Sequence, residues 1–177
     1  HKGLYGAFIV DPKEPLWQPA REMVMIMNAF DTDFDGENEF YAVNTLANYH
    51  IAYPIEIKRG ELVRIYLINL TEFDPINSFH LHGNVFKLYR TGTRPDQYEI
   101  TDLVTLCQAE RCVVEFKYDM PGMFMFHAHQ SEFAELGWNG LFKVVEPTAF
   151  APAPAGSAYV CPLPADGLAS SGTSSQT

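Results

Sequence analysis

The hydrophobic positions of this chain form short runs, and turn-forming residues separate them. The runs that read as strands are Met23–Ala29, Pro54–Ile57, Leu62–Leu70, Ser78–Arg90, Cys112–Tyr118, Gly122–His129 and Gly140–Val145. Glycine, proline and aspartate lie between them, and the apolar spacing of a long helix is hard to find. About seven short strands with such turns predict an all-β domain, an antiparallel sandwich or barrel.

The composition of the chain changes at both ends. Residues 3–10 are apolar and read as a strand, and the proline-rich stretch after them reads as a linker. We therefore expect residues 1–12 to be the end of a preceding domain, residues 13–21 a linker and residues 22–147 the main domain. Residues 148–177 are rich in proline, alanine and serine, which is typical of a linker or a disordered tail.

Four of the six histidines occur in two His-x-His pairs, His80–His82 and His127–His129. Alternate residues of a strand share a face, so the histidines of each pair lie about 7 Å apart along the chain on one side. Neutral imidazole is the commonest protein ligand of transition metals, and two pairs therefore predict a metal site. A single pair would more often be hydrogen-bonded strand histidines. His50 has no companion, and we expect it to be a surface or hydrogen-bonded histidine.

Apolar residues occupy the opposite face of both His-x-His segments. They are Phe79, Leu81, Phe124, Phe126 and Ala128. If this apolar face packs into the core of the domain, the imidazoles point outward, toward a cleft or another domain. The metal site would then be only half present in this domain.

The charge and hydropathy of the chain limit its partners. It has 12 Lys and Arg against 22 Asp and Glu residues, a formal net charge of −10, and no basic cluster. This balance argues against nucleic acid or an anionic membrane surface as a partner. The hydrophobic content of 47% is ample for a core. No apolar run reaches the roughly 18 residues that a membrane-spanning helix needs, so no membrane-spanning helix is expected.

The three cysteines allow two interpretations. Cys107 and Cys112 flank a plausible hairpin loop, and a disulfide across it would leave Cys161 unpaired. The alternative is three free or buried thiols. The sequence leaves both possibilities open.

The acidic segment Asp31–Gly36 has the spacing that begins a calcium-binding loop. Such a loop needs a bidentate glutamate at its twelfth position, which here is Ala42, and helices on both sides. The flanks read as strands instead. We therefore expect a solvated acidic hairpin.

The segments Ser78–Gly83 and Gly122–His129, with Gly137 and Trp138 downstream, resemble the copper motifs of multicopper oxidases. The resemblance covers about residues 3–146 and includes the apolar run that ends at Pro12. It implies an all-β, cupredoxin-like fold, a Greek-key β-sandwich or barrel. It also implies a trinuclear copper cluster between two domains, at which dioxygen is reduced to water. This family holds the cluster with four His-x-His motifs, and this chain contains two of them.

The resemblance implies a role for each histidine. His80 matches the ligand of the type 2 copper, and His82, His127 and His129 match ligands of the type 3 pair. The positions that would hold a type 1 copper carry non-ligating residues, namely Asn77, Ala128, Phe133 and Trp138. We therefore expect type 2 and type 3 copper, and no type 1 copper, in this domain.

A domain without type 1 ligands resembles the second domain of two-domain enzymes similar to small laccases. In these enzymes the type 1 copper lies in the first domain. The implied activity is oxidation of a phenol, an aromatic amine or a metal ion at a type 1 copper in a partner domain. A homotrimer, with the cluster between neighbouring subunits, and an extracellular or periplasmic location are also implied.

Oxygen reduction consumes protons, so a carboxylate near the cluster is expected to deliver them. Asp102 and Glu132 are the candidates for this catalytic role, although either could be a solvated acid. Two other functions stay open: a cupredoxin-like module that binds or stores copper without turnover, and a copper enzyme similar to nitrite reductase. Two complete His-x-His pairs in one domain favour the trinuclear oxidase.

Overall fold

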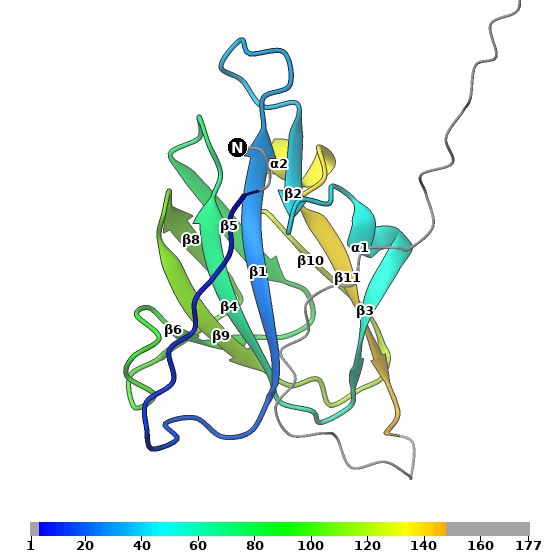
Figure 1. The fold of residues 1–177 in the computed structure, drawn as a ribbon. Coiled ribbons are helices and arrows are strands. Elements are labelled where there is room, and N and C mark those ends of the chain that lie inside the picture. Colours follow the sequence, from blue (N-terminus) through cyan, green and yellow to red (C-terminus); the bar gives the residue numbers. More distant parts are fainter. Residues whose placement is uncertain (1–3, 148–177) are drawn as a thin grey trace, which may run out of the picture.

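The computed structural model describes residues 4–147, which form two β-sheets packed face to face (Figure 1). One sheet has six strands in the order β2-β1-β4-β9-β6-β7, and the other has five in the order β3-β11-β10-β5-β8. The strands are β1 (Arg21–Phe30), β2 (Phe40–Val43), β3 (Tyr53–Lys58), β4 (Val63–Leu70), β5 (Ile76–Leu81), β6 (Phe86–Tyr89), β7 (Glu99–Thr101), β8 (Leu103–Cys107), β9 (Arg111–Phe116), β10 (Gly122–His127) and β11 (Asn139–Val145). Two short helices, α1 (Tyr49–Ala52) and α2 (Ser131–Glu135), complete the fold. The all-β prediction is confirmed.

The strand pairing differs from the sequence prediction in two ways. The run predicted over residues 78–90 divides into β5 and β6, which belong to different sheets. The chain turns between them at Gly83, whose positive φ of 66° suits glycine. The sheets are also mixed, because β1 pairs with β4 and β3 with β11 in parallel. The purely antiparallel prediction is wrong at these two pairs.

The N-terminal segment forms no strand over residues 4–20, so the strand predicted for residues 3–10 is wrong over its described part. The segment, dark blue in Figure 1, is held by side chains instead of by a strand ladder. The Tyr5 hydroxyl donates to Asn28 Oδ1 on β1 at 2.7 Å and also contacts Thr45 Oγ1. Further along, the Gln18 carbonyl accepts a 2.7 Å hydrogen bond from Arg64 Nη2 on β4.

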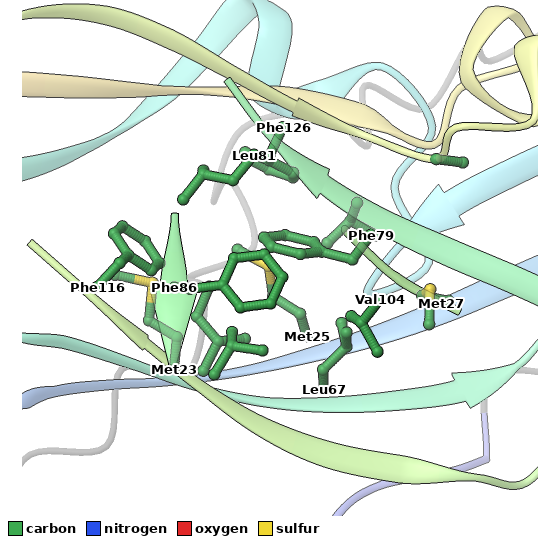
Figure 2. Close-up of a cluster of buried hydrophobic side chains, with 14 of the residues drawn as sticks. Met23, Met25, Met27, Leu67, Phe79, Leu81, Phe86, Val104, Phe116 and Phe126 are labelled. Atoms are coloured by element: carbon green, nitrogen blue, oxygen red, sulfur yellow. The ribbon is translucent and has the colours of Figure 1, made fainter. Parts of the chain in front are cut away.

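The core lies between the two sheets (Figure 2). Phe79 and Leu81 on β5 and Phe126 on β10 point into it and are buried, as are Met25 and Leu67 of the six-stranded sheet. Burying a side chain of this size stabilises a fold by about 1.5–3 kcal/mol. The apolar faces of both His-x-His segments therefore pack into the core, as the sequence predicts.

The two cysteines near residue 110 are free thiols that lie in different sheets. Cys107 ends β8 with its side chain exposed, whereas Cys112 on β9 is buried in the core. The hairpin that a disulfide would have crossed is not formed, because the chain passes from one sheet to the other between them. The disulfide hypothesis is wrong for this pair. Cys161 and the tail predicted for residues 148–177 lie outside the described residues.

Within residues 4–147 the helices have only four and five residues. None of them has the length and hydropathy needed to cross a bilayer.

Candidate metal centre

The two His-x-His pairs lie side by side because β5 and β10 are antiparallel neighbours in the five-stranded sheet. The register pairs His80 directly with His127. His82 follows the last residue of β5, and His129 lies two residues beyond β10. All four imidazoles therefore gather at the adjoining ends of two strands, on the face that points away from the core.

The imidazole rings converge on one point. The ring centroid of His80 lies 5.0 Å from that of His82, 5.3 Å from that of His127 and 5.2 Å from that of His129. The ligand nitrogens of His80, His82 and His127 all lie within 4.8 Å of one another. His82 Nε2 and His127 Nε2 are 2.9 Å apart, so a shared proton or a metal ion is needed between their lone pairs. This donor set fits a transition metal.

Backbone carbonyls orient two of the rings. His80 Nδ1 lies 2.9 Å from the Asp102 carbonyl oxygen, and His127 Nδ1 lies 2.5 Å from the Ala128 carbonyl oxygen. Each carbonyl accepts a hydrogen bond from Nδ1–H, which leaves the Nε2 lone pair of that ring free. Metal-binding histidines commonly show this arrangement, since it fixes both the tautomer and the ring.

Burial lowers the pKa of two imidazoles of the cluster, those of His82 and His127. Desolvation is the main cause that lowers the pKa of His82, and the neighbouring His80 and His129 lower it further. Desolvation also lowers the pKa of His127, against the opposing effect of its hydrogen bond to Ala128. Protonation of one imidazole disfavours protonation of the next. Both histidines therefore remain unprotonated, and able to bind a metal, at a lower pH than an isolated histidine.

Hydrogen bonds fix the segment that holds His82. Its N–H donates to the Met125 carbonyl at 2.9 Å, and its own carbonyl accepts a 2.7 Å hydrogen bond from the Tyr118 hydroxyl. The following Gly83 packs on Phe124, whose ring would lie 3.0 Å from an added Cβ. The turn after β5 therefore has little freedom, and His82 keeps its place beside β10.

Ser78 is a site residue that the sequence analysis missed. Its side chain is buried, and its hydroxyl accepts a 2.8 Å hydrogen bond from the His129 backbone N–H. The same hydroxyl lies 2.5 Å from Gln130 Oε1 and donates to it. The signal was present in the sequence, because Ser78 precedes His80 by two residues and so shares its face of β5.

The structure separates the two candidate proton donors. Asp102 lies between β7 and β8, with its carboxylate Oδ2 3.9 Å from His80 Nδ1. Glu132 lies in the first turn of α2 with its side chain exposed. Within residues 4–147, Asp102 is the carboxylate that approaches an imidazole of the cluster. It also lines a surface pocket of about 620 Å³ together with His80, Leu81, His82, Gly83, Asn84 and Val85.

The positions that match type 1 ligands are filled by packed side chains. Ala128, Phe133 and Trp138 belong to the buried core cluster, and the Phe133 ring stacks on Tyr41 with centroids 4.0 Å apart. Asn77 is buried too and donates from Nδ2 to Thr71 Oγ1 at 2.8 Å. Buried apolar side chains and one buried amide side chain therefore fill the positions that match type 1 copper ligands.

His50 does not join the cluster. It is buried beside β11, and its Nδ1 lies 3.3 Å from the Tyr53 carbonyl oxygen. The expectation of a hydrogen-bonded histidine holds.

The acidic segment forms the loop between β1 and β2. Its carboxylates lie within 4.8 Å of one another and belong to Asp31, Asp33, Asp35 and Glu39. They accept hydrogen bonds from backbone N–H groups of the same loop, such as those of Thr32 and Gly36. These bonds stabilise an exposed acidic hairpin, as the sequence predicts.

A β-sandwich with four imidazoles converging from two neighbouring strands defines a cupredoxin-like metalloprotein domain. The sequence profile of the family described as Multicopper oxidase matches residues 17–148. The chain therefore belongs to the multicopper oxidase family, whose metal is copper.

Individual relatives agree with this family. A solved structure described as a multicopper oxidase is 51% identical with a TM-score of 0.75, over 78% of this chain and 48% of that chain. A probable nitrite reductase-hydroxylamine oxidoreductase fusion protein of Kuenenia stuttgartiensis is 30% identical over 82% of this chain and 17% of its own length. A copper-containing nitrite reductase of Neisseria meningitidis is 27% identical, over 72% of this chain and 37% of its own length. The chain spans less than half the length of each of these proteins.

Proposed function

We propose that this domain supplies half of a trinuclear copper cluster that reduces dioxygen to water. The observation that carries the proposal is the convergence of both His-x-His pairs on one outward-facing site. His80 would hold the type 2 copper, and His82, His127 and His129 would hold the type 3 pair. The 2.9 Å approach of His82 Nε2 to His127 Nε2 supports a shared role for these two histidines. Bound copper would supply the electron transfer to dioxygen.

A partner domain would complete the cluster. The four imidazoles face outward, and His129 is exposed, so residues 4–147 enclose the site on one side only. Large apolar side chains are exposed on the same sheet face and beside the pocket, namely Ile76, Val85 and Leu103. Such a surface around a half-built site supports burial against another domain. We propose a neighbouring cupredoxin domain in a homotrimer, with residues 1–12 as the end of a preceding domain and residues 13–21 as the linker.

The reducing substrate would be a phenol, an aromatic amine or a metal ion, oxidised at a type 1 copper of the partner domain. The packed side chains at Ala128, Phe133 and Trp138 support the absence of a type 1 copper from this domain. An extracellular or periplasmic location is part of the same proposal.

Asp102 would serve as the proton donor for oxygen reduction. Its backbone carbonyl orients His80, and its carboxylate lies at the rim of the site, where it is 57% exposed to solvent. A carboxylate in that position can take protons from water and hold them next to the cluster. Asp102→Asn keeps the backbone carbonyl and removes the acid. It should slow dioxygen uptake while copper content stays unchanged, and Glu132→Gln, at an exposed position on α2, is the matched control.

A nitrite-reducing copper enzyme is the second candidate, because two of the relatives above are described as nitrite reductases. A copper-binding or storage module without turnover is the third. The full-length protein, loaded with copper, should be assayed for dioxygen uptake with a phenol as electron donor and for nitrite reduction under anaerobic conditions. The oxidase proposal predicts dioxygen uptake dependent on His127. Nitrite turnover without dioxygen uptake would favour the second candidate, and copper binding without either activity the third.

A further inference from the structure

The six methionines of the chain fall into two groups. The members of the first group lie on β1 and are at most 8% exposed: Met23, Met25 and Met27. The second group lies just before His127. Met120 is 67% exposed and Met123 51% exposed, and Met125 is partly buried. Core packing explains the first group, whereas it does not explain large apolar side chains of the second group that face solvent.

The second group lies in line with the histidine cluster. Met123, Met125 and His127 alternate along β10, so they share the outer face, while Phe124 and Phe126 pack against or into the core. The β5–β10 register continues from the His80–His127 pair, and His82 N–H donates to the Met125 carbonyl at 2.9 Å. Met125 therefore lies opposite His82, and opposite residues of an antiparallel pair have neighbouring side chains. The Met125 thioether therefore lies beside the histidine cluster, and the Met123 thioether lies two residues away on the same face of β10.

Thioether sulfur is a soft, uncharged ligand that selects cuprous ions over divalent metals. Leucine would cover the same surface without offering such a ligand. We infer that Met123 and Met125 form an entry site for Cu(I), which passes the ion to His82 and His127. The transfer is a ligand exchange: a copper–sulfur bond breaks as a copper–nitrogen bond forms, and no electron moves. The hydrogen that His82 Nε2 shares with His127 Nε2 in the metal-free cluster moves to His82 Nδ1, so no proton is released. The inference deepens the proposed function, since it rests on copper binding by these histidines.

The experiment compares copper loading of the metal-free protein by Cu(I) buffered with bicinchoninate under anaerobic conditions. The test variant is Met123→Leu/Met125→Leu, and Met23→Leu, in the core, is the matched control for the exchange of methionine for leucine. We expect the test variant to load about tenfold more slowly than the wild type, by analogy with changes next to metal ligands. Its final copper content after prolonged loading should equal that of the wild type. Equal loading rates for all three proteins would overturn the inference.

A second measurement separates this inference from the proposed function. X-ray absorption at less than one equivalent of Cu(I) should detect sulfur scattering in the wild type and in His82→Ala/His127→Ala, and none in the double leucine variant. If the histidines bind no copper, the wild type keeps its sulfur scattering: the methionines then still bind Cu(I), whereas the proposed function and the transfer to the histidines fail. If the wild type binds copper through nitrogen alone from the first addition, the entry site fails alone. Circular dichroism of each variant, with Met125→Leu as a milder substitution, verifies folding.

Discussion

The Ser78 hydroxyl lies 2.8 Å from the backbone nitrogen of His129 and accepts its hydrogen bond. Ser78 is on β5, two residues before His80, whereas His129 follows β10. One buried hydroxyl therefore joins the segment that holds the first His-x-His pair to the segment that holds the second. This bond sets the position of His129, which is exposed, relative to the other three imidazoles.

Replacing Ser78 with alanine should remove the hydrogen bond that holds the backbone of His129 in place. The substitution leaves the His129 N–H without its partner, which should cost about 1–3 kcal/mol of folding stability. Copper affinity should fall by about 10-fold to 100-fold, as for other groups that support metal ligands. Copper titration and urea unfolding check both effects. Thr105→Ala is the control, because Thr105 is the exposed neighbour of Ser78 on β8, and an equal loss of affinity there would contradict the account.

Arg64 should contribute more to stability than any exposed ion pair of the domain. It is buried on β4, donates from Nε and Nη2 to Glu115 Oε1 at 2.8 and 2.6 Å, and pairs with Glu22 at 2.7 Å. Arg64→Ala leaves Glu115 buried without a cation, which should cost about 3–5 kcal/mol.

The control for this prediction is an exposed ion pair, that of Arg90 with Glu99. Arg90 lies 3.3 Å from Glu99 with both side chains about half exposed, so Arg90→Ala should cost at most about 1 kcal/mol. Urea unfolding of the two variants measures the difference. Similar losses of unfolding free energy in the two variants would show that the buried Arg64 ion pairs stabilise the domain no more than the exposed pair does.

Acid should destabilise the metal-free protein through His50. Burial lowers the folded-state pKa of His50 from its ordinary value of 6.5, and its contact with the Tyr53 carbonyl opposes this only in part. Below pH 6.5 the unfolded chain therefore binds a proton that the folded chain still excludes, and stability falls as the pH falls toward the folded-state pKa. Urea unfolding between about pH 8 and pH 5 should give a shallower decline for His50→Gln. An identical decline in the variant would refute this role.

The two described thiols should differ in reactivity. Cys107 is exposed, whereas burial raises the pKa of Cys112 to about 12. Reactivity follows the accessible thiolate, so iodoacetamide should modify Cys107 in the folded protein and Cys112 only after unfolding. Peptide mapping by mass spectrometry identifies each modified residue. A disulfide-linked peptide containing both cysteines would contradict the fold.

The metal centre could be anticipated from the sequence because its signal is local. The alternation around His80 and His127 distinguishes an inward apolar face from an outward polar face, and the structure buries Phe79, Leu81 and Phe126 as that pattern requires. The convergence of the two pairs was expected only from the resemblance to multicopper oxidases. Local alternation does not show it, since it depends on β5 and β10 being neighbours, although 45 residues separate His82 from His127.

Errors arose where local composition and tertiary pairing disagree. Residues 4–10 have an apolar, strand-like composition, but none of them joins a sheet here. The exposed Cys107 and the buried Cys112 looked like hairpin partners because the change of sheet between β8 and β9 leaves no local mark. Asp102 contacts His80 through its backbone carbonyl, and a side-chain pattern does not predict a backbone contact.

The most direct test of the copper-site proposal is an anomalous difference map, recorded at the copper absorption edge, from crystals of the copper-loaded full-length protein. We expect copper peaks bonded to Nε2 of His80, His82 and His127 and to the imidazole of His129, with further ligands from a neighbouring cupredoxin domain. Loss of these peaks in His80→Ala/His127→Ala, and their retention in His50→Gln, would assign them to the cluster. Copper bound elsewhere, or four imidazoles without copper, would contradict the account.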